Sequence, residues 1–203
     1  ILYARNLVNP EQIGCLTNSL QECAPNPPLL IAIDQEGGQV SRLPQGFTIF
    51  PSAATIANCG SSVLAHSAGA VTAKELLAVG INMNMAPVLD VNTNPANPII
   101  GNRAYSKDPD EVCKFGVATL KGLQENGVIA CGKHFPGHGD TTCDSHKILP
   151  LVNAQRPRLE QTELAPFRYS IAKGLSAIMT AHVRYPALDP DAPATLSRKI
   201  LTD

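Results

Sequence analysis

The apolar positions of this chain fall into short continuous runs and into longer segments in which they recur at helical spacing. Residues 29–33 and 128–131 are continuous apolar runs, which is typical of strands that are buried on both faces of a parallel sheet. Less regular apolar segments occur at residues 1–4, 81–91 and 175–181. Strands are therefore expected at residues 1–4, 29–33, 81–91, 128–131 and 175–181.

Helices are expected between these strands, and several of them carry recognisable end signals. Asn9 followed by Pro10 matches an N-cap and a first helical position, and Asp108 followed by Pro109 repeats the pattern. Gly80, Gly127 and Gly174 each follow one of the expected helices, and a glycine at this position is typical of a helix end. The expected helices begin at Pro10, span residues 62–79, run from Asp108 to Gly127, span residues 158–173, and begin again after a Ser197 cap.

This alternation of strands and helices predicts an α/β fold with a parallel sheet. Polar residues follow most of the expected strands, and such residues converge from many strands in a barrel but from one switch point in a doubly wound sheet. No Gly-x-Gly-x-x-Gly pattern follows a strand, which disfavours a dinucleotide-binding fold. We expect a (β/α)8 barrel in a single domain, residues 1–203. It is expected to be incomplete, because at most six strands fit a chain shorter than the ~250 residues typical of such barrels.

Residues 132–146 (GKHFPGHGDTTCDSH) carry the densest chemistry in the chain. Three of the five histidines, two aspartates and a lysine lie within this segment, directly after an apolar run. Its glycines and its proline exclude a long helix or a regular strand. A loop this rich in groups that exchange protons near neutral pH predicts a functional site.

The composition of the chain limits the classes of partner that can be expected. The net charge of -1 and the pI of about 6.6 give no sign of a nucleic-acid partner. No apolar run approaches the ~20 residues of a membrane span, so no membrane partner is expected. The six cysteines lack a framework spacing and are expected to be free thiols. A cytoplasmic location is expected because no targeting segment is visible.

Several segments together resemble a known family. They are residues 33–43 (IDQEGGQVSRL), 86–91 (APVLDV), 101–105 (GNRAY), 133–146 and 179–183 (MTAHV). These residues resemble the N-terminal domain of family 3 glycoside hydrolases, and the long histidine-rich motif resembles the bacterial β-N-acetylglucosaminidase branch. The resemblance implies a (β/α)8 barrel, no cofactor and no metal. It also implies retaining hydrolysis of terminal β-linked N-acetylglucosamine, with peptidoglycan fragments as the carbohydrate substrate.

His146 is the candidate acid/base, with Asp144 two residues upstream. Retaining hydrolysis needs a group that first donates and later accepts a proton, and an ordinary histidine pKa near 6.5 suits both roles. A neighbouring aspartate can fix the tautomer of the ring. The resemblance assigns the same roles to both residues. The alternative is a solvated histidine beside a capping aspartate in a surface loop.

The candidate sugar-binding residues are donors and acceptors near strand ends: Asp34, Arg42, Arg103, Lys133 and His134. The resemblance places each at a sugar-contacting position. Arg42 and Arg103 could instead pair with a strand-end carboxylate such as Glu36 or Asp90. The roles of Asp90 and His182 stay open at this point, and His66 is expected to be structural.

Two other functions remain open. A metal-dependent hydrolase could use His134, His138, Asp140, Asp144 and His146 as ligands, although proline and glycines disfavour the helix that would aim the first two histidines the same way. A sugar-binding fragment without turnover is the second alternative.

The nucleophilic carboxylate is expected beyond Asp203, which should itself lie on a helix after the Pro193–Ser197 segment.

Overall fold

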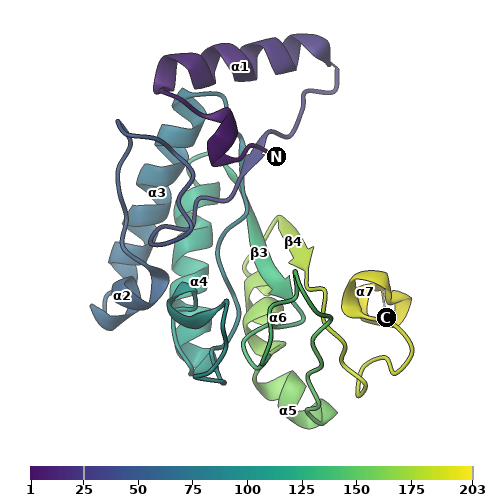
Figure 1. Ribbon diagram of the computed structural model, residues 1–203. Coiled ribbons are helices and arrows are strands. Elements are labelled where there is room, and N and C mark those ends of the chain that lie inside the picture. The colour runs from purple at the N-terminus through teal and green to yellow at the C-terminus, as the bar shows by residue number, and fades with distance from the viewer. Residues whose placement is uncertain (25, 203) are drawn as a thin grey trace.

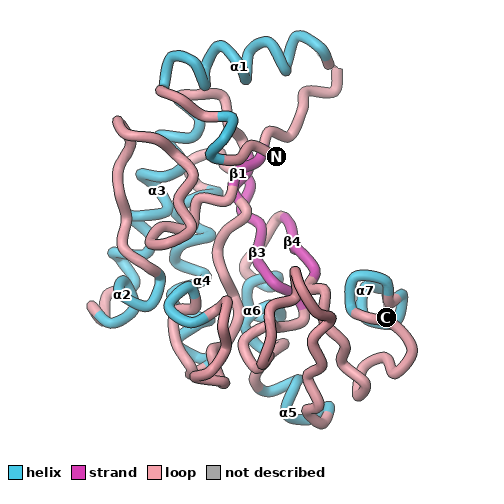
Figure 2. The backbone as a smooth tube through the Cα atoms, in the orientation of Figure 1, coloured by secondary structure: helices cyan, strands magenta, loops and turns pink. Residues whose placement is uncertain are grey.

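Four parallel strands form one sheet in which the order of the strands follows the sequence, β1-β2-β3-β4. The structure is a computed structural model that describes residues 1–24 and 26–202. The strands are β1 (Ala32–Ile33), β2 (Met83–Asn84), β3 (Ile129–Phe135) and β4 (Ala177–Thr180). The helices are α1 (Pro10–Cys23), α2 (Ala53–Asn58), α3 (Ser62–Ala78), α4 (Pro109–Gln124), α5 (Arg156–Gln161), α6 (Ala165–Ala172) and α7 (Arg198–Thr202), with 3-10 turns at Ala4–Asn6, Gly101–Arg103 and Ala194–Leu196. Short strands occupy the centre and helices surround them (Figures 1 and 2).

The two faces of the sheet pack against different partners because neighbouring strand residues point to opposite sides. Ile31, Ile33 and Ala130 belong to the main core, together with apolar residues of α3 and α4. Ala32, Met85 and Cys131 belong to a second cluster on the other face, completed by Met83, Ala177 and Met179. A sequential, all-parallel sheet with helices outside one face and small or flexible apolar residues on the other agrees with part of a barrel wall.

Helices α3 and α4 lie side by side on the outer face of the sheet (Figure 1) and approach closely at two glycines. A Cβ atom at Gly122 would lie 2.1 Å from the carbonyl oxygen of His66, and one at Gly69 would lie 2.6 Å from that of Thr119. Both distances are shorter than real Cβ contacts, so a side chain at either position would push the two helices apart. The absence of side chains at these two positions therefore lets α3 and α4 pack directly against each other.

The three helix starts predicted from capping residues are confirmed. Asn9 accepts a hydrogen bond from the Gln12 amide, and Asp108 accepts one from the Asp110 amide. Ser197 Oγ likewise accepts from the amide of Ile200 at the start of α7. Asp203 lies outside the described residues.

Several predictions were wrong in extent. The strand expected at residues 29–33 is only Ala32–Ile33, and the strand expected at residues 128–131 continues to Phe135, into the segment expected as a loop. The single helix expected at residues 158–173 is broken into α5 and α6, because Pro166 lacks an amide proton and its ring collides with the carbonyl four residues earlier. The strand expected at residues 81–91 is only Met83–Asn84, since Pro87 cannot donate to the ladder; the pairing resumes as an isolated bridge from Val88 to Lys133. The segment expected as a strand at residues 1–4 contributes one parallel bridge, Leu2 to Ile33.

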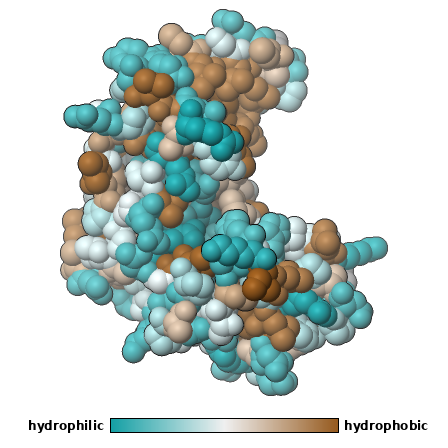
Figure 3. Space-filling model, viewed as in Figure 1, coloured by the Kyte–Doolittle hydropathy of each residue, from teal (hydrophilic) through white to brown (hydrophobic). Residues whose placement is uncertain are grey.

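In space-filling view the surface is indented between the part that carries α1 and the part that carries α7 (Figure 3). Apolar residues border the upper side of this indentation. Within residues 1–24 and 26–202, no helix combines the length and the apolar character that a bilayer crossing requires.

Candidate active site

A cavity of about 480 Å³ opens where the carboxyl ends of the strands meet. Asp34 directly follows β1, Lys133 and His134 lie in the second half of β3, and His182 follows β4. The cavity brings together six of the residues predicted from the sequence: Asp34, Arg42, Arg103, Lys133, His134 and His146. Glu36, His138, Ser145 and His182 line it as well. The predicted convergence of strand-end polar residues is therefore present in the structure.

Lys133 forms the centre of the cavity floor. Its Nζ lies 2.6 Å from Asp34 Oδ1 and 2.6 Å from Glu36 Oε1, and its side chain is 2% exposed. An ammonium group has three N–H donors, so two are used by these carboxylates and one remains for a bound molecule. Asp34 keeps a second oxygen as an acceptor. The floor therefore offers one donor and one acceptor from a single ion pair.

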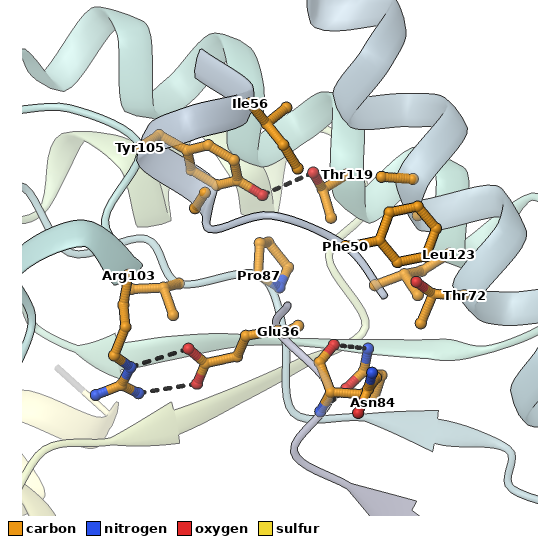
Figure 4. Close-up of a pocket in the computed structure, with 16 residues that line it drawn as sticks. Glu36, Phe50, Ile56, Thr72, Asn84, Pro87, Arg103, Tyr105, Thr119 and Leu123 are labelled. Atoms are coloured by element: carbon orange, nitrogen blue, oxygen red, sulfur yellow. Dashed lines mark hydrogen bonds and ion pairs between the residues drawn. The ribbon is translucent and has the colours of Figure 1, made fainter. Parts of the chain in front are cut away.

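Glu36 also holds Arg103, so the ion pair named as the alternative role of this arginine is present in the structure. Arg103 Nε lies 2.9 Å from Glu36 Oε2 and Arg103 Nη2 lies 2.8 Å from Glu36 Oε1, a two-pronged contact visible in Figure 4. Burial raises the pKa of Glu36, but the hydrogen bond from Arg103 and the charges of Lys133 and Arg103 together lower it below its usual value. Arg103 thus faces the cavity and is paired at the same time.

Arg42 is held differently. Its backbone amide donates to Gln35 Oε1 at 2.8 Å, and within residues 1–24 and 26–202 its guanidinium forms no ion pair with Glu36 or Asp90. The Nε atom of Arg42 is buried without a hydrogen-bond partner in the structure. A buried unpartnered donor is costly, so a bound acceptor at this position would be favoured.

His134 and His138 are both fixed by Asp90, whose role the sequence left open. Asp90 is fully buried and accepts from His134 Nδ1 at 2.6 Å, from the His134 amide at 3.2 Å and from the His138 amide at 2.5 Å. Burial would raise the pKa of Asp90, yet the His134 ring and these hydrogen bonds lower it. Asp90 is therefore an ionised support beneath the cavity.

The contacts of His134 also assign its tautomer. An ionised Asp90 can only accept, so His134 Nδ1 carries the proton. On the other side of the ring, Arg103 Nη2 lies 3.5 Å from His134 Nε2, and an arginine can only donate. His134 Nε2 is therefore an acceptor on the cavity side, and because its single lone pair meets Arg103 only at 3.5 Å, a closer hydroxyl or amide donor could replace that contact.

His146 and Asp144 are in direct contact, as predicted. His146 Nδ1 and the His146 amide both lie 2.9 Å from Asp144 Oδ1, and the hydrogen bonds from His146 lower the pKa of Asp144. This contact leaves His146 Nε2 free for proton transfer. The side chain of His146 is 83% exposed, so it lines the cavity from the open side while the floor residues are buried.

The remaining histidines lie in two different settings. His182 lines the cavity and its Nδ1 lies 2.9 Å from Thr195 Oγ1. His66 instead pairs with Glu125 at 2.8 Å and so joins α3 to the end of α4, away from the cavity. This contact agrees with the structural role expected for His66 from the sequence. Among the described residues, no group of three His, Cys, Asp or Glu side chains converges as metal ligands would.

The central position of Glu36 was not predicted from the sequence. Asp34 and Glu36 are two residues apart at a strand end, and residues with this spacing point to the same side of a strand. That spacing was a usable signal for a pair of carboxylates around one cation. The sequence indicated His138 only as a possible metal ligand. In the structure its Nδ1 lies 2.8 Å from Thr141 Oγ1, and burial lowers the pKa of its ring.

Comparisons with known proteins agree with this geometry. Residues 1–203 match the family described as "Glycosyl hydrolase family 3 N terminal domain". A β-hexosaminidase from Nitrosomonas eutropha is 43% identical over 209 residues, which cover all of this chain and 59% of that protein. The chain thus spans little more than half the length of this relative.

Two solved structures are similar throughout. A glycoside hydrolase family 3 β-N-acetylglucosaminidase from Paenibacillus sp. is 48% identical with a TM-score of 0.96, over 98% of this chain and 39% of that one. NagZ from Neisseria gonorrhoeae, in complex with N-trifluoroacetyl-D-glucosamine, is 40% identical with a TM-score of 0.88, over 95% of this chain and 58% of that one. These likenesses confirm the predicted α/β fold of barrel type.

Proposed function

The chain belongs to the glycosyl hydrolase family 3 N-terminal domain family, and from this premise we propose that the protein hydrolyses terminal β-linked N-acetylglucosamine. The observation that supports the proposal best is the cavity itself, in which a buried set of sugar-type donors and acceptors faces an exposed histidine–aspartate pair. The relatives described as β-hexosaminidase and β-N-acetylglucosaminidase support the same activity.

In this proposal the cavity floor binds the terminal sugar. The free N–H of Lys133 and the free oxygen of Asp34 pair with neighbouring hydroxyls, and His134 Nε2 accepts from a third group. Arg42 and Arg103 lie around the same ring as further donors. Removing one such partner leaves a buried polar group unpaired, which costs about 1–3 kcal/mol.

His146 acts as the acid and then as the base. Its Nε2–H donates a proton to the glycosidic oxygen while the bond from that oxygen to the anomeric carbon breaks and an enzyme carboxylate bonds to the carbon. A water molecule then attacks the carbon, and His146 Nε2 takes its proton as the carboxylate leaves. Asp144 holds Nδ1–H throughout and so keeps Nε2 directed to the reaction.

The nucleophile is expected outside residues 1–203. Among the described residues, the carboxylates on the cavity wall are Asp34 and Glu36, and each already bonds Lys133. A carboxylate that pairs with a buried cation is a weak nucleophile, because the cation stabilises its negative charge. We therefore propose that residues 1–203 bind the sugar and supply the proton.

The test uses the full-length protein and an aryl N-acetyl-β-glucosaminide, with turnover as the readout. We expect His146→Ala to reduce turnover of substrates with poor leaving groups far more than turnover of the aryl substrate. His66→Ala is the matched control, because His66 is also an exposed, carboxylate-paired histidine but lies outside the cavity. Absence of turnover with intact sugar binding would favour the second candidate, a sugar-binding protein without catalysis.

We further propose that the natural substrates are peptidoglycan fragments and that the protein works in the reducing cytoplasm. All six cysteines are free thiols in the structure, which suits a reducing compartment. Digestion of purified muropeptides followed by mass spectrometry tests the substrate. Release of N-acetylglucosamine is the expected product, and failure on every fragment that carries a terminal N-acetylglucosamine would contradict this choice.

A further inference from the structure

Glu36 occupies a position that sugar binding alone does not require. Both of its oxygens are used inside the protein, because Oε1 contacts Lys133 and Arg103 while Oε2 contacts Arg103. The side chain is 6% exposed. Behind it lies a small interior cavity of about 30 Å³ between the sheet and helices α2, α3 and α4, where Figure 4 shows the Glu36–Arg103 pair. The contacts of Glu36 are therefore made to two cations of the protein, Lys133 and Arg103.

Those two cations are close to one another. Lys133 Nζ lies 2.6 Å and Arg103 Nη2 lies 2.8 Å from the same oxygen of Glu36. Two like charges at such spacing repel strongly in a buried setting, where screening by salt and water is weak. The carboxylate between them makes this arrangement stable.

The charges around the floor balance. Its carboxylates are Asp34, Glu36 and the supporting Asp90, and its cations are the following three residues: Arg42, Arg103 and Lys133. Each carboxylate contacts at least one cation or histidine ring at 2.6 to 2.8 Å. The low pKa of Glu36 and of Asp90 agrees with both being ionised. The result is a floor rich in charged groups but without net charge.

We propose that Glu36 is a specificity-determining residue: by cancelling one of the clustered positive charges, it makes the floor select an uncharged sugar over an anionic one. This rests on the proposed sugar-binding function of the same cavity. Without Glu36 the floor would carry an excess positive charge from Lys133 and Arg103. A sugar with a carboxylate would then gain attraction that a neutral sugar does not gain.

The experiment compares two ligands of nearly equal shape on the full-length protein. The ligands are N-acetylglucosamine and its 6-carboxylate analogue, and isothermal titration measures both Kd values. In Glu36→Gln, the ratio of the two Kd values is expected to shift at least tenfold toward the anionic sugar, which corresponds to ~1.4 kcal/mol. A gain in relative affinity for one ligand cannot arise from damage to the fold alone.

Three further variants complete the test. Arg42→Gln removes a positive charge and should shift the ratio in the opposite direction, and it keeps the proposal testable if Glu36→Gln does not fold. Glu36→Asp keeps the charge and should keep the preference for the neutral sugar at lower affinity. Glu160→Gln, in the exposed ion pair with Arg156, is the matched control and should leave the ratio unchanged.

The outcomes separate the two proposals. If the unmodified protein binds neither ligand, the sugar-binding function is wrong. If it binds N-acetylglucosamine but neither Glu36→Gln nor Arg42→Gln changes the ratio, the function stands and the role of Glu36 is refuted.

Discussion

Replacing Asp90 by asparagine tests how far one buried carboxylate organises the cavity. Its Oδ2 accepts from His134 Nδ1, and its Oδ1 accepts from the backbone amides of His134 and His138. An asparagine of the same shape has one oxygen and one NH2 group. If the oxygen stays with the two backbone amides, the NH2 group faces His134 Nδ1, and two donors cannot share that contact.

The ring of His134 then has to move its proton to Nε2. That N–H would point toward Arg103 Nη2, 3.5 Å away, and the acceptor that faces the cavity becomes a donor. Hydrogen bonds to a charged group contribute about 1.5–3 kcal/mol, so we expect a loss of that order in the free energy of unfolding. We also expect sugar affinity to fall at least tenfold, because a ligand donor now meets a donor.

Urea unfolding measures the first effect and titration with N-acetylglucosamine measures the second. The ring 15N chemical shifts of His134 report the tautomer directly. The matched control is Asp140→Asn, since Asp140 contacts Arg158 and Thr93 outside the sugar-binding floor. If the Asp90 variant kept its stability, its affinity and the Nδ1–H tautomer, the account of Asp90 and His134 would be wrong.

Three further outcomes follow from the structure. His146→Ala should lower kcat by roughly 10² to 10⁴ on substrates with poor leaving groups while leaving the urea midpoint unchanged, because the ring is 83% exposed; an equal loss on activated aryl substrates would contradict an acid/base role. Gly122→Ala should destabilise the fold by about 1–3 kcal/mol, measured by urea unfolding, because its Cβ would lie 2.1 Å from the His66 carbonyl oxygen. The lowered pKa values of Glu36 and Asp90 contribute stability that is present above their unfolded values near ~4 and is lost as pH falls through the lower folded values, so Tm should drop on acidification below about pH 4. The Glu36→Gln, Asp90→Asn double variant should show a flatter acid limb, and an unchanged limb would contradict this assignment.

Much of the fold was predictable because its signals are local. Asn9 and Ser197 were identified as caps from residue type and position, and both cap their helices in the structure. The lengths of β1 and β2 were overestimated, because apolar character continues past the last ladder hydrogen bond, whereas β3 was underestimated, because it extends through the polar residues Lys133 and His134 to Phe135. The six-residue helix α2 was not predicted, since it is too short for a periodic pattern and only its Ser52 cap marks it.

The site was predictable in place but not in its connections. The loop motif and the strand-end residues located Lys133, His134 and His146 correctly on one cavity. The role of Asp90 was not predictable, because it depends on the chain returning to place the His138 amide 2.5 Å from the carboxylate. The sharing of Glu36 between two cations likewise arises only when elements distant in the sequence are folded together.

The loop that carries His146 is attached to the protein in two unequal halves. Its first half is clamped, since Asn97 Nδ2 donates to the carbonyls of His138 and Gly139 and to Thr141 Oγ1. In its second half, residues 142–149, the hydrogen bonds found in the described structure join Asp144 to His146, Lys147 and Ile148, which all belong to the same segment. We therefore expect that the loop from residue 142 onward can be exchanged between relatives with a change in turnover and no change in the sugar that the floor accepts.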